Sequence, residues 1–483
     1  FRVTPRVTLS LGLRYEYQAP WTEANGYLSV FDIKSGKIVV PDSALSKVSP
    51  LMPTNYVGVI SASQAGLPSN LINGHDKGFG PRFGVAWRPL DKDTVFRAGF
   101  GIYYDNYVEK PAATSVPFAI TEPAFTNPVN NPTVILPNVF PLTGSGGLTT
   151  VAIPNAENPN IRVPYTMQAS LTMEHQFGNT AVSLSLISTG TRQGVYGYDI
   201  NQPLPSTTPY VNAPRRFPSL PNINYFTNGA GHQWRGGSVQ VKRSFRNGLW
   251  FQAYYMLARD IGDLDYDQVL ENAYNRQRDR GPLSDQPTHR FHGMMIYDFP
   301  FGTGKRFLPN ANRWLNALVG GWQLSNIFVH ASGFDLTPLW TGPDPTNTRF
   351  TTSSTPPTVT LRPNLLSNPN LSNPTVTRWF DVGAFSAPLP GAFGTSAPGV
   401  IIGPGLTILN STMKKYFTIR ERLKLRLELV AANVLNHDGY LGNPDLTITN
   451  RGTAGTITAD ANLNTRVDTA QSRQMQVIVR VEW

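Results

Sequence analysis

The stretch YTMQASLTMEHQF, residues 165–177, alternates apolar and polar side chains with a period of two. One parity carries Tyr165, Met167, Ala169, Leu171, Met173 and Phe177, with His175 as its one polar member. Successive side chains of a β-strand point to opposite faces, so the segment is predicted to be an amphipathic strand. Its 13 residues exceed the ~5–6 of a usual soluble strand and suit the ~9–11 with which a tilted strand crosses a bilayer.

The same pattern recurs along the whole chain. It is clear at 7–17, at 423–429 and at the end, RQMQVIVRVEW, residues 473–483. Weaker segments of the same kind are 81–88, 95–104, 181–190, 235–245, 249–259, 290–299, 321–332 and 405–416. Together these segments predict twelve long strands, which makes the chain all-β.

The connections between these strands alternate between short and long. The short ones are 88–95, 177–181, 245–249 and 417–423, and 300–320 is of intermediate length where a short one is due. The long ones are 18–80, 105–164, 191–234, 260–289, 333–404 and 436–472. This alternation is typical of transmembrane antiparallel β-barrels of the bacterial outer membrane, whose periplasmic turns are short and whose extracellular loops are long. It places both ends of the chain on the periplasmic side.

Composition narrows the class of protein further. Charged residues make up 15% of the chain, against roughly 25% in typical globular proteins, so much of its surface lacks the usual charge. The net charge of +10 comes from scattered Lys and Arg, which speaks against nucleic-acid binding. With no cysteine, disulfides and thiolate metal sites are excluded. No run of ~18 apolar residues predicts a membrane helix. The alternative is a soluble β-sandwich or solenoid, whose strands should be shorter.

Several stretches of the chain together resemble one family. They are residues 3–26, 78–105, 158–180, 280–307, 320–334, 378–394 and 421–444. In this order they resemble the C-terminal barrel portion of TonB-dependent outer-membrane receptors of the Oar-like group. The resemblance implies a barrel of about 22 strands around an N-terminal plug. We therefore expect residues 1–483 to be the C-terminal part of a single barrel domain, with the plug and N-terminal domain absent from this chain.

The resemblance also implies a function. It is transport of a bulky substrate across the outer membrane, driven through contact of the plug region with TonB. Two alternatives stay open, namely a surface adhesion or structural barrel and a passive porin.

Motifs for catalysis or cofactors are weak, so we predict neither an enzyme nor a cofactor. GTGKR, residues 302–306, lacks the first Gly and the final Ser or Thr of a phosphate-binding loop. His289 and His292 would lie on opposite faces of a strand. Carboxylate pairs such as Glu271 with Asp285, or Asp344 with Asp381, are not positioned together by any pattern. A weak candidate for a Ca²⁺ site consists of Asp263, Asp265 and Asp267. The alternative interpretation, a solvated loop, is favoured.

The polar parity of the strands is expected to face the barrel lumen. Its charged candidates are Arg14, Glu16, Arg82, Arg97, Glu174, Lys242, Arg290, Arg426 and Glu428. They either attract an anionic solute or pair with one another and with the plug, and the second reading is favoured. Aromatic residues expected in loops, which either contact a ligand or pack the loops together, are Trp21, Trp234, Trp340 and Trp379.

The last strand carries a further prediction. Its apolar parity ends in an aromatic residue and comprises Met475, Val477, Val479, Val481 and Trp483. This ending resembles the signal by which the barrel-assembly machinery recognises its clients. The expected partners are therefore outer-membrane lipid, TonB and the barrel-assembly machinery.

Overall fold

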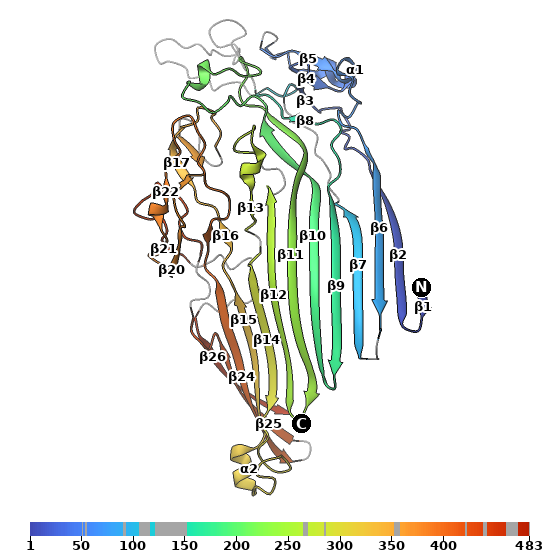
Figure 1. The fold of residues 1–483 in the computed structure, drawn as a ribbon, viewed down its shortest axis with the longest axis vertical. Helices are drawn as coiled ribbons and strands as arrows, with labels where there is room; N and C mark the ends of the chain where they lie inside the picture. Colours follow the sequence, from blue (N-terminus) through green and yellow to red (C-terminus); the bar gives the residue numbers. More distant parts are fainter. Residues whose placement is uncertain are drawn as a thin grey trace, which may run out of the picture.

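One large antiparallel sheet dominates the computed structural model of the chain (Figure 1). The structure describes residues 1–50, 52–53, 56–89, 93–105, 116–120, 152–263, 269–284, 286–351, 358–420, 423–437, 442–459 and 472–482. In sheet order its main strands are β1 (Arg2–Thr4), β2 (Val7–Gln18), β6 (His75–Trp87), β7 (Thr94–Tyr104), β9 (Tyr165–Phe177), β10 (Thr180–Asp199), β11 (Asn224–Arg246), β12 (Leu249–Asp263), β14 (His289–Asp298), β15 (Trp322–Ala331), β24 (Leu406–Arg420), β25 (Leu423–Ala432) and β26 (Gln474–Glu482).

The twelve predicted strands are confirmed as β2, β6, β7, β9 to β12, β14, β15 and β24 to β26. Each pairs antiparallel with the next along the chain, and the short β1 pairs with β2. The strands β8 (Ala156–Glu157) and β13 (Arg280–Pro282) attach to β11 and β12. Within the described ranges no pairing joins β1 to β26, so the sheet has two open edges.

The short connections lie at one end of the sheet (Figure 1). The turn between β11 and β12 consists of Asn247 and Gly248, which both have positive φ, 53° and 78°. Such a two-residue turn matches the right-handed twist of the paired strands. The first residue of β2 pairs with Trp87, next to another short turn, and Glu482 of β26 pairs with Lys424. The beginning of β2 and the end of β26 thus lie on the short-turn side.

The intermediate connection, 299–321, holds the helix α2 (Arg313–Val319) at the same end of the sheet (Figure 1). Asn312 caps this helix by accepting a hydrogen bond from the Leu315 N–H at 2.9 Å. The Lys415 ammonium of β24 donates to the Gly320 carbonyl just after the helix, and it lies over the Trp322 ring at 5.1 Å. None of the helices in the described ranges has the length and apolar character needed to cross a bilayer.

Two strands extend well beyond their predicted ends. The segments predicted at 181–190 and 235–245 are the lower parts of β10 and β11, which continue to Asp199 and begin at Asn224. In the extension of β10, the neighbouring residues Gly194 and Val195 are both buried. A bulge interrupts the ladder between Thr191 and Val195, and Val195 is buried in a cluster with Ile72 and Ile161 of two long connections. The alternation that marks a half-exposed strand is therefore lost there.

The long connections fold into small sheets of their own. The first sheet is β3 (Val30–Asp32), β4 (Lys37–Val40) and β5 (Val59–Ser61). The connection 333–404 contains the strand pairs β16 (Asp335–Leu336) with β23 (Ile401–Ile402), β17 (Trp340–Pro343) with β18 (Thr358–Leu361), β19 (Asn364–Leu365) with β22 (Phe385–Ser386), and β20 (Asn370–Thr375) with β21 (Arg378–Phe380). Short helices in the long connections are α1 (Ala62–Ala65), η1 (Asp42–Lys47), η2 (Tyr210–Asn212), η3 (Arg276–Asp279) and η4 (Val382–Ala384). Residues 341–376, which are rich in Pro, Thr and Ser, therefore contain short paired strands.

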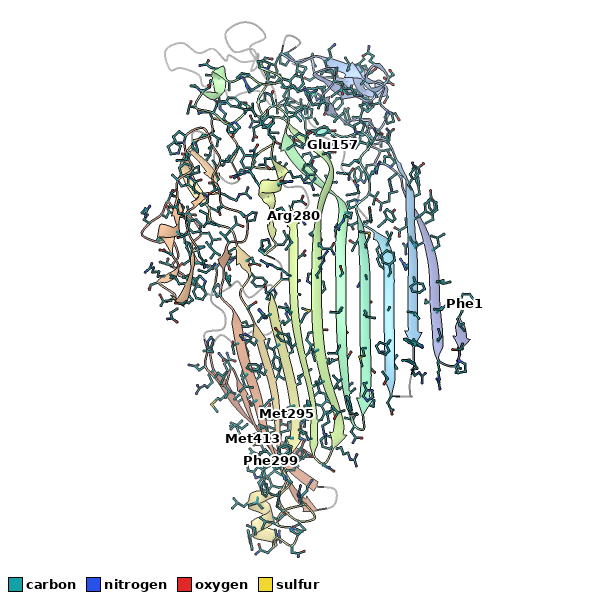
Figure 2. The ribbon with its side chains drawn as sticks, viewed as in Figure 1. Phe1, Glu157, Arg280, Met295, Phe299 and Met413 are labelled. Atoms are coloured by element: carbon teal, nitrogen blue, oxygen red, sulfur yellow. The ribbon has the colours of Figure 1, made fainter. Side chains whose placement is uncertain are left out.

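Most of the hydrophobic core lies in these connections and not in the long strands of the main sheet. One cluster joins residues of 333–404 to Ile448 and includes the fully buried Phe380. Another, around Phe31 and Ile38, joins three connections by also including Val116 and Ile223. Figure 2 shows the side chains crowded at the loop end, whereas along the strands they stand out singly from the sheet. The long connections therefore form a packed layer over one end of the sheet, which we call the loop layer.

Candidate functional site

The register of the ladders divides the side chains of the main sheet between two faces. Residues that pair directly across antiparallel strands point to the same side. One row of directly opposed residues therefore lies on a single face of the sheet. From β2 to β10 this row consists of Gly12, Arg82, Gly101, Gln168 and Thr189. This face, which we call the polar face, carries hydrogen bonds such as Thr172 Oγ1 to Ser185 Oγ at 2.9 Å. The opposite, apolar face exposes the large apolar side chains.

The nine predicted lumen charges all share the polar face. They are Arg14, Glu16, Arg82, Arg97, Glu174, Lys242, Arg290, Arg426 and Glu428. The three carboxylates are each paired with an arginine: Glu16 with Arg14, Glu174 with Arg97 at 3.3 Å, and Glu428 with Arg426 at 2.5 Å. Each carboxylate of this set is therefore neutralised by an arginine on the same face of the sheet.

Three bases of this set remain. The Arg82 guanidinium lies over the Tyr103 ring, 4.6 Å from its centroid, which stabilises the cation but does not neutralise it. Neither Lys242 nor Arg290 forms an ion pair with a carboxylate in the described part of the chain. Among the nine predicted charges, the structure thus leaves three bases without an acidic partner in the described ranges.

Above this face, a buried charge cluster joins two long connections. The Arg362 guanidinium contacts Glu271 Oε2 at 2.8 Å and Asp279 Oδ1 at 2.8 Å, and Arg278 contacts Glu271 Oε2 at 3.0 Å. The Arg362 N–H also donates to Glu271 Oε1 at 2.9 Å. Burial raises the pKa of Asp279 to about 6, although Arg362 opposes the shift. Hence η3 and Arg362, which directly follows β18, are held together by largely buried side chains.

A cavity of about 310 Å³ borders this cluster. Glu271, Asp279 and Arg362 contribute to its wall, together with Asp335 and the ring of Phe350. Burial raises the pKa of Asp335 as well. The Oδ2 atom of Asp279 is buried and makes no hydrogen bond among the described residues. Sequence reasoning named Glu271 as part of a carboxylate pair with Asp285, which lies outside the described residues, and it missed the pairing with Arg362 because the two are 91 positions apart.

The four tryptophans predicted for loops occupy different surroundings. Trp21 is 49% exposed, whereas Trp340 is buried in the cluster around Phe380. Trp379 packs partly against that cluster and donates its indole N–H to the Ile402 carbonyl at 2.8 Å. The prediction that Trp234 lies in a loop was wrong, because β11 begins ten residues earlier. Its direct partners Thr189 and Asp260 place it on the polar face.

The weak cation candidate is only partly within the described residues. Asp263 ends β12, where its Oδ2 accepts from the Arg276 guanidinium at 2.7 Å and its Oδ1 accepts from the Gly231 N–H at 2.8 Å. Asp265 and Asp267 lie outside the described residues. Within the described ranges, no group of three His, Asp or Glu side chains is arranged to hold a metal ion. Both oxygens of Asp263 have protein partners, which favours a structural role.

The remaining motifs have structural explanations. GTGKR, residues 302–306, forms a turn before α2, with Gly302 and Gly304 at positive φ. His289 and His292 lie on opposite faces of β14, as their spacing predicted, since His289 pairs with Leu257 and His292 with Tyr254. Asp344 accepts hydrogen bonds in a tight turn from the N–H groups of Thr346, Asn347 and Arg349. Asp381 pairs with Arg378 at 3.1 Å.

The predicted assembly signal is the apolar edge of the sheet. Met475, Val477, Val479 and Val481 alternate along β26 and are exposed on the apolar face. Val477 and Val479 pair with Leu429 and Leu427, which places them in line with the apolar parity of β25. Trp483 lies outside the described residues.

Long amphipathic strands, short turns at one end and a packed loop layer at the other define an outer-membrane-type β-barrel protein. A family model for the "Outer membrane beta barrel domain" matches residues 1–476, and the chain belongs to this family. Membership places the protein in the bacterial outer membrane. No curated protein is similar enough to this sequence to count as a match.

Solved structures to which this chain is similar include one outer-membrane transporter and two receptors. They are the transporter YddB from Escherichia coli (10% identity, TM-score 0.38), the ferric preacinetobactin receptor BauA from Acinetobacter baumannii (10%, 0.40) and the ferric-catecholate import receptor Fiu from E. coli K12 (7%, 0.40). The matches cover 85%, 86% and 100% of this chain. They cover 42%, 37% and 43% of those proteins, so this chain spans less than half the length of each.

Proposed function

We propose that the chain is the C-terminal part of a single barrel domain of a TonB-dependent outer-membrane receptor of the Oar-like group. In this proposal the apolar face meets lipid, the polar face lines the lumen, the short turns lie in the periplasm and the loop layer is extracellular. The sequence resemblance supports the family. The observation that carries transport is the charged polar face, which continues across the main sheet beneath the loop layer.

The transported substrate is bulky and carries negative charge. The uncompensated bases Arg82, Lys242 and Arg290 favour an anion, because like-signed groups along a low-dielectric wall raise the local concentration of the opposite charge. Trp234, on the same face, supplies an aromatic surface for contact with the substrate. The same bases also suit contact with the plug of the intact protein.

Cross-linking to TonB tests the transporter most directly. The intact protein that carries this chain is expected to form a cross-link with TonB in cells, and a TonB-contacting segment is expected upstream of residue 1. A surface adhesion or structural barrel would form no such cross-link.

Conductance separates the proposal from a passive porin. In a planar bilayer, the purified intact protein should show no steady open channel, because a plug closes the lumen. A stable, TonB-independent conductance would favour the porin and contradict the proposal. Mass spectrometry of what co-purifies with the intact protein would then identify the substrate.

A further inference from the structure

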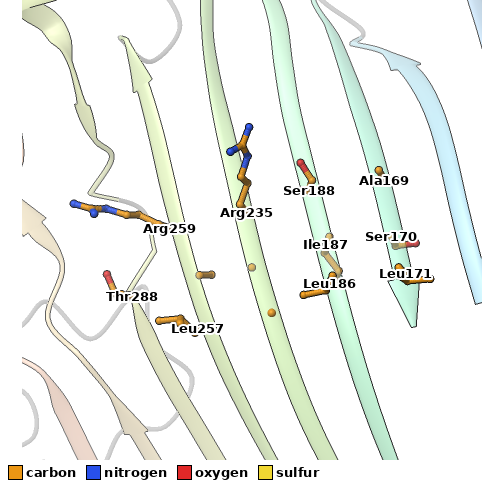
Figure 3. A pocket seen from close by; sticks show the side chains of 13 residues that line it. Ala169, Ser170, Leu171, Leu186, Ile187, Ser188, Arg235, Leu257, Arg259 and Thr288 are labelled. Atoms are coloured by element: carbon orange, nitrogen blue, oxygen red, sulfur yellow. The ribbon is translucent and has the colours of Figure 1, made fainter. Parts of the chain in front are cut away.

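A groove lies on the apolar face of the main sheet, across β9 to β12 (Figure 3). Its volume is about 750 Å³. Leu171, Leu186 and Leu257 form its walls, and the small residues Gly237 and Ala169 leave room between them. Leu186 pairs with both Leu171 and Gly237, and Gly237 pairs with Leu257, so the groove follows one row of directly opposed positions.

Two arginines occupy the loop-layer end of the groove. Arg235 and Arg259 are exposed, lie on the apolar face and pair directly with each other across β11 and β12. Like charges at directly opposed positions destabilise a sheet, because their Cβ atoms are only about 5 Å apart. Ser188, which pairs with Arg235, adds a hydroxyl to the same end of the groove. The arrangement therefore concentrates positive charge next to an apolar depression.

No ion pair of Arg235 or Arg259 with a carboxylate occurs in the described part of the chain. Arg259 interacts electrostatically with the carboxylate of Asp335 in β16. Burial raises the pKa of Asp335, and the Arg259 guanidinium opposes this shift. Arg192, on the same face of β10, donates to Gln233 Oε1 and to backbone carbonyls, which leaves its charge in place. The positive charge at this end is thus only partly neutralised by the protein.

The position of the arginines along the strands matches a membrane boundary. Arg235 is ten residues from Phe245, an exposed aromatic residue at the short-turn end of β11. Ten residues of strand span about 33 Å, or about 25 Å along the membrane normal at the usual tilt. That is about the height of the apolar band of an outer-membrane barrel. If Phe245 lies at the periplasmic boundary, the two guanidinium groups lie at the headgroup level of the outer leaflet.

We propose that this groove binds a phosphate-bearing lipid of the outer leaflet, with an acyl chain along Leu171, Leu186 and Leu257 and a phosphate between Arg235 and Arg259. The planar guanidinium presents paired N–H donors that match phosphate oxygens. A lipid fits both parts of the site at once. Its phosphate would lie at the arginines near the loop layer, and its acyl chain would lie along the leucines closer to the short turns. The site rests on the proposed orientation of the barrel in the membrane but not on TonB or on the transported substrate.

The test is lipid binding to the intact protein in a neutral detergent, followed by native mass spectrometry. The probes are diphosphorylated lipid A, the same glycolipid without phosphates, and inorganic pyrophosphate. We expect tight binding of the first, and at least tenfold weaker binding of the other two. Equal binding of the dephosphorylated lipid would reduce the site to apolar surface, and equal binding of pyrophosphate would reduce it to an anion site; either result overturns the proposal.

Variants locate the site. The double variant R235Q/R259Q should weaken lipid A binding at least tenfold, and Gly237→Leu should weaken it by filling the groove. The matched control is Arg243→Gln, which removes one positive charge from the same strand and the same face but outside the groove, and it should bind normally. Unchanged binding by the double variant, or an equal loss in the control, would contradict the site. Heat-modifiable migration on a gel verifies that each variant forms a barrel, and TonB cross-linking separates failure of this site from failure of the proposed function.

Discussion

Replacing Arg362 by Met should open the loop layer, and the size of the effect follows from its contacts. The guanidinium is the partner of two buried carboxylates, Glu271 and Asp279, and Met retains most of its apolar volume. Removing one partner from a buried ion pair costs about 3–5 kcal/mol, because the remaining charge stays desolvated. Arg278 still neutralises part of the charge on Glu271, so we expect the lower end of this range, about 3 kcal/mol, near pH 7.5.

The defect should also depend on pH. Burial raises the pKa of Asp279 from 3.8 to about 6, so the folded loop binds a proton more tightly than the unfolded loop does. The stability that this proton contributes is fully present below pH 3.8 and is lost as the pH rises through about 6. Because Arg362 lowers this pKa, its removal raises it further. At pH 5 Asp279 is then mostly neutral in the variant, and the destabilisation should be smaller than at pH 7.5.

Hydrogen exchange measures this opening directly. The backbone N–H of residue 362, which donates to Glu271 in the native protein, should exchange roughly 150-fold faster at pH 7.5 for a loss of about 3 kcal/mol. Rates at pH 5 and 7.5 are compared after correction for intrinsic exchange. The control is Arg378→Met, which breaks an exposed pair with Asp381 in the same connection and should cost at most about 1 kcal/mol. If the Arg362 variant behaves like this control, or if its defect is the same at both pH values, the reasoning is refuted.

Three further predictions concern the loop layer, the sheet and assembly. Gly333→Ala should destabilise the connection 333–404, measured as faster proteolysis, because its Cβ would meet a facing glycine carbonyl oxygen at 1.7 Å; Gly452→Ala, with open space around it, should have no effect. Leu11→Arg, on the apolar face, should cost about 2–4 kcal/mol and lower the amount of heat-modifiable protein, whereas Ser10→Arg on the polar face should be tolerated, and equal losses would contradict the two faces. Deleting Trp483 should lower assembled protein far more than synthesis, and unchanged outer-membrane levels would count against an assembly signal.

The strands could be predicted because one physical constraint repeats along them. A strand with one apolar and one polar face must alternate, and this rule predicted all twelve long strands of the sheet. It failed where a bulge and contacts with the long connections interrupt it, as at Val195 in the extension of β10. It also misplaced Trp234, whose neighbours in sequence no longer alternate cleanly although the residue lies within β11. Apolar and polar side chains alternate only where the two faces of a strand have different surroundings, and the pattern is lost where they do not.

The candidate sites could not be predicted fully from the sequence, because they depend on contacts between residues that are distant in the chain. The sharing of a face by the nine predicted charges followed from parity within each strand, but the pairing of Arg97 with Glu174 depends on the register between β7 and β9. The Arg362 cluster joins residues far apart in sequence, for which no local pattern exists. The outward Arg235 and Arg259 each look like an isolated charge in an apolar parity, and their pairing across β11 and β12 is a property of the sheet.

The division of the sheet into a lipid-facing and a lumen-facing side is the central claim, and one measurement tests it. Because the chain has no cysteine, single cysteines at residues 167–173 of β9 can each carry a fluorophore in the intact protein, reconstituted in lipid bilayers. Quenching by brominated lipids should alternate with a period of two, strong at Met167, Leu171 and Met173 and weak at Gln168 and Thr172, with aqueous iodide showing the opposite pattern. Quenching by iodide alone at every position, or no alternation at all, would contradict a transmembrane barrel.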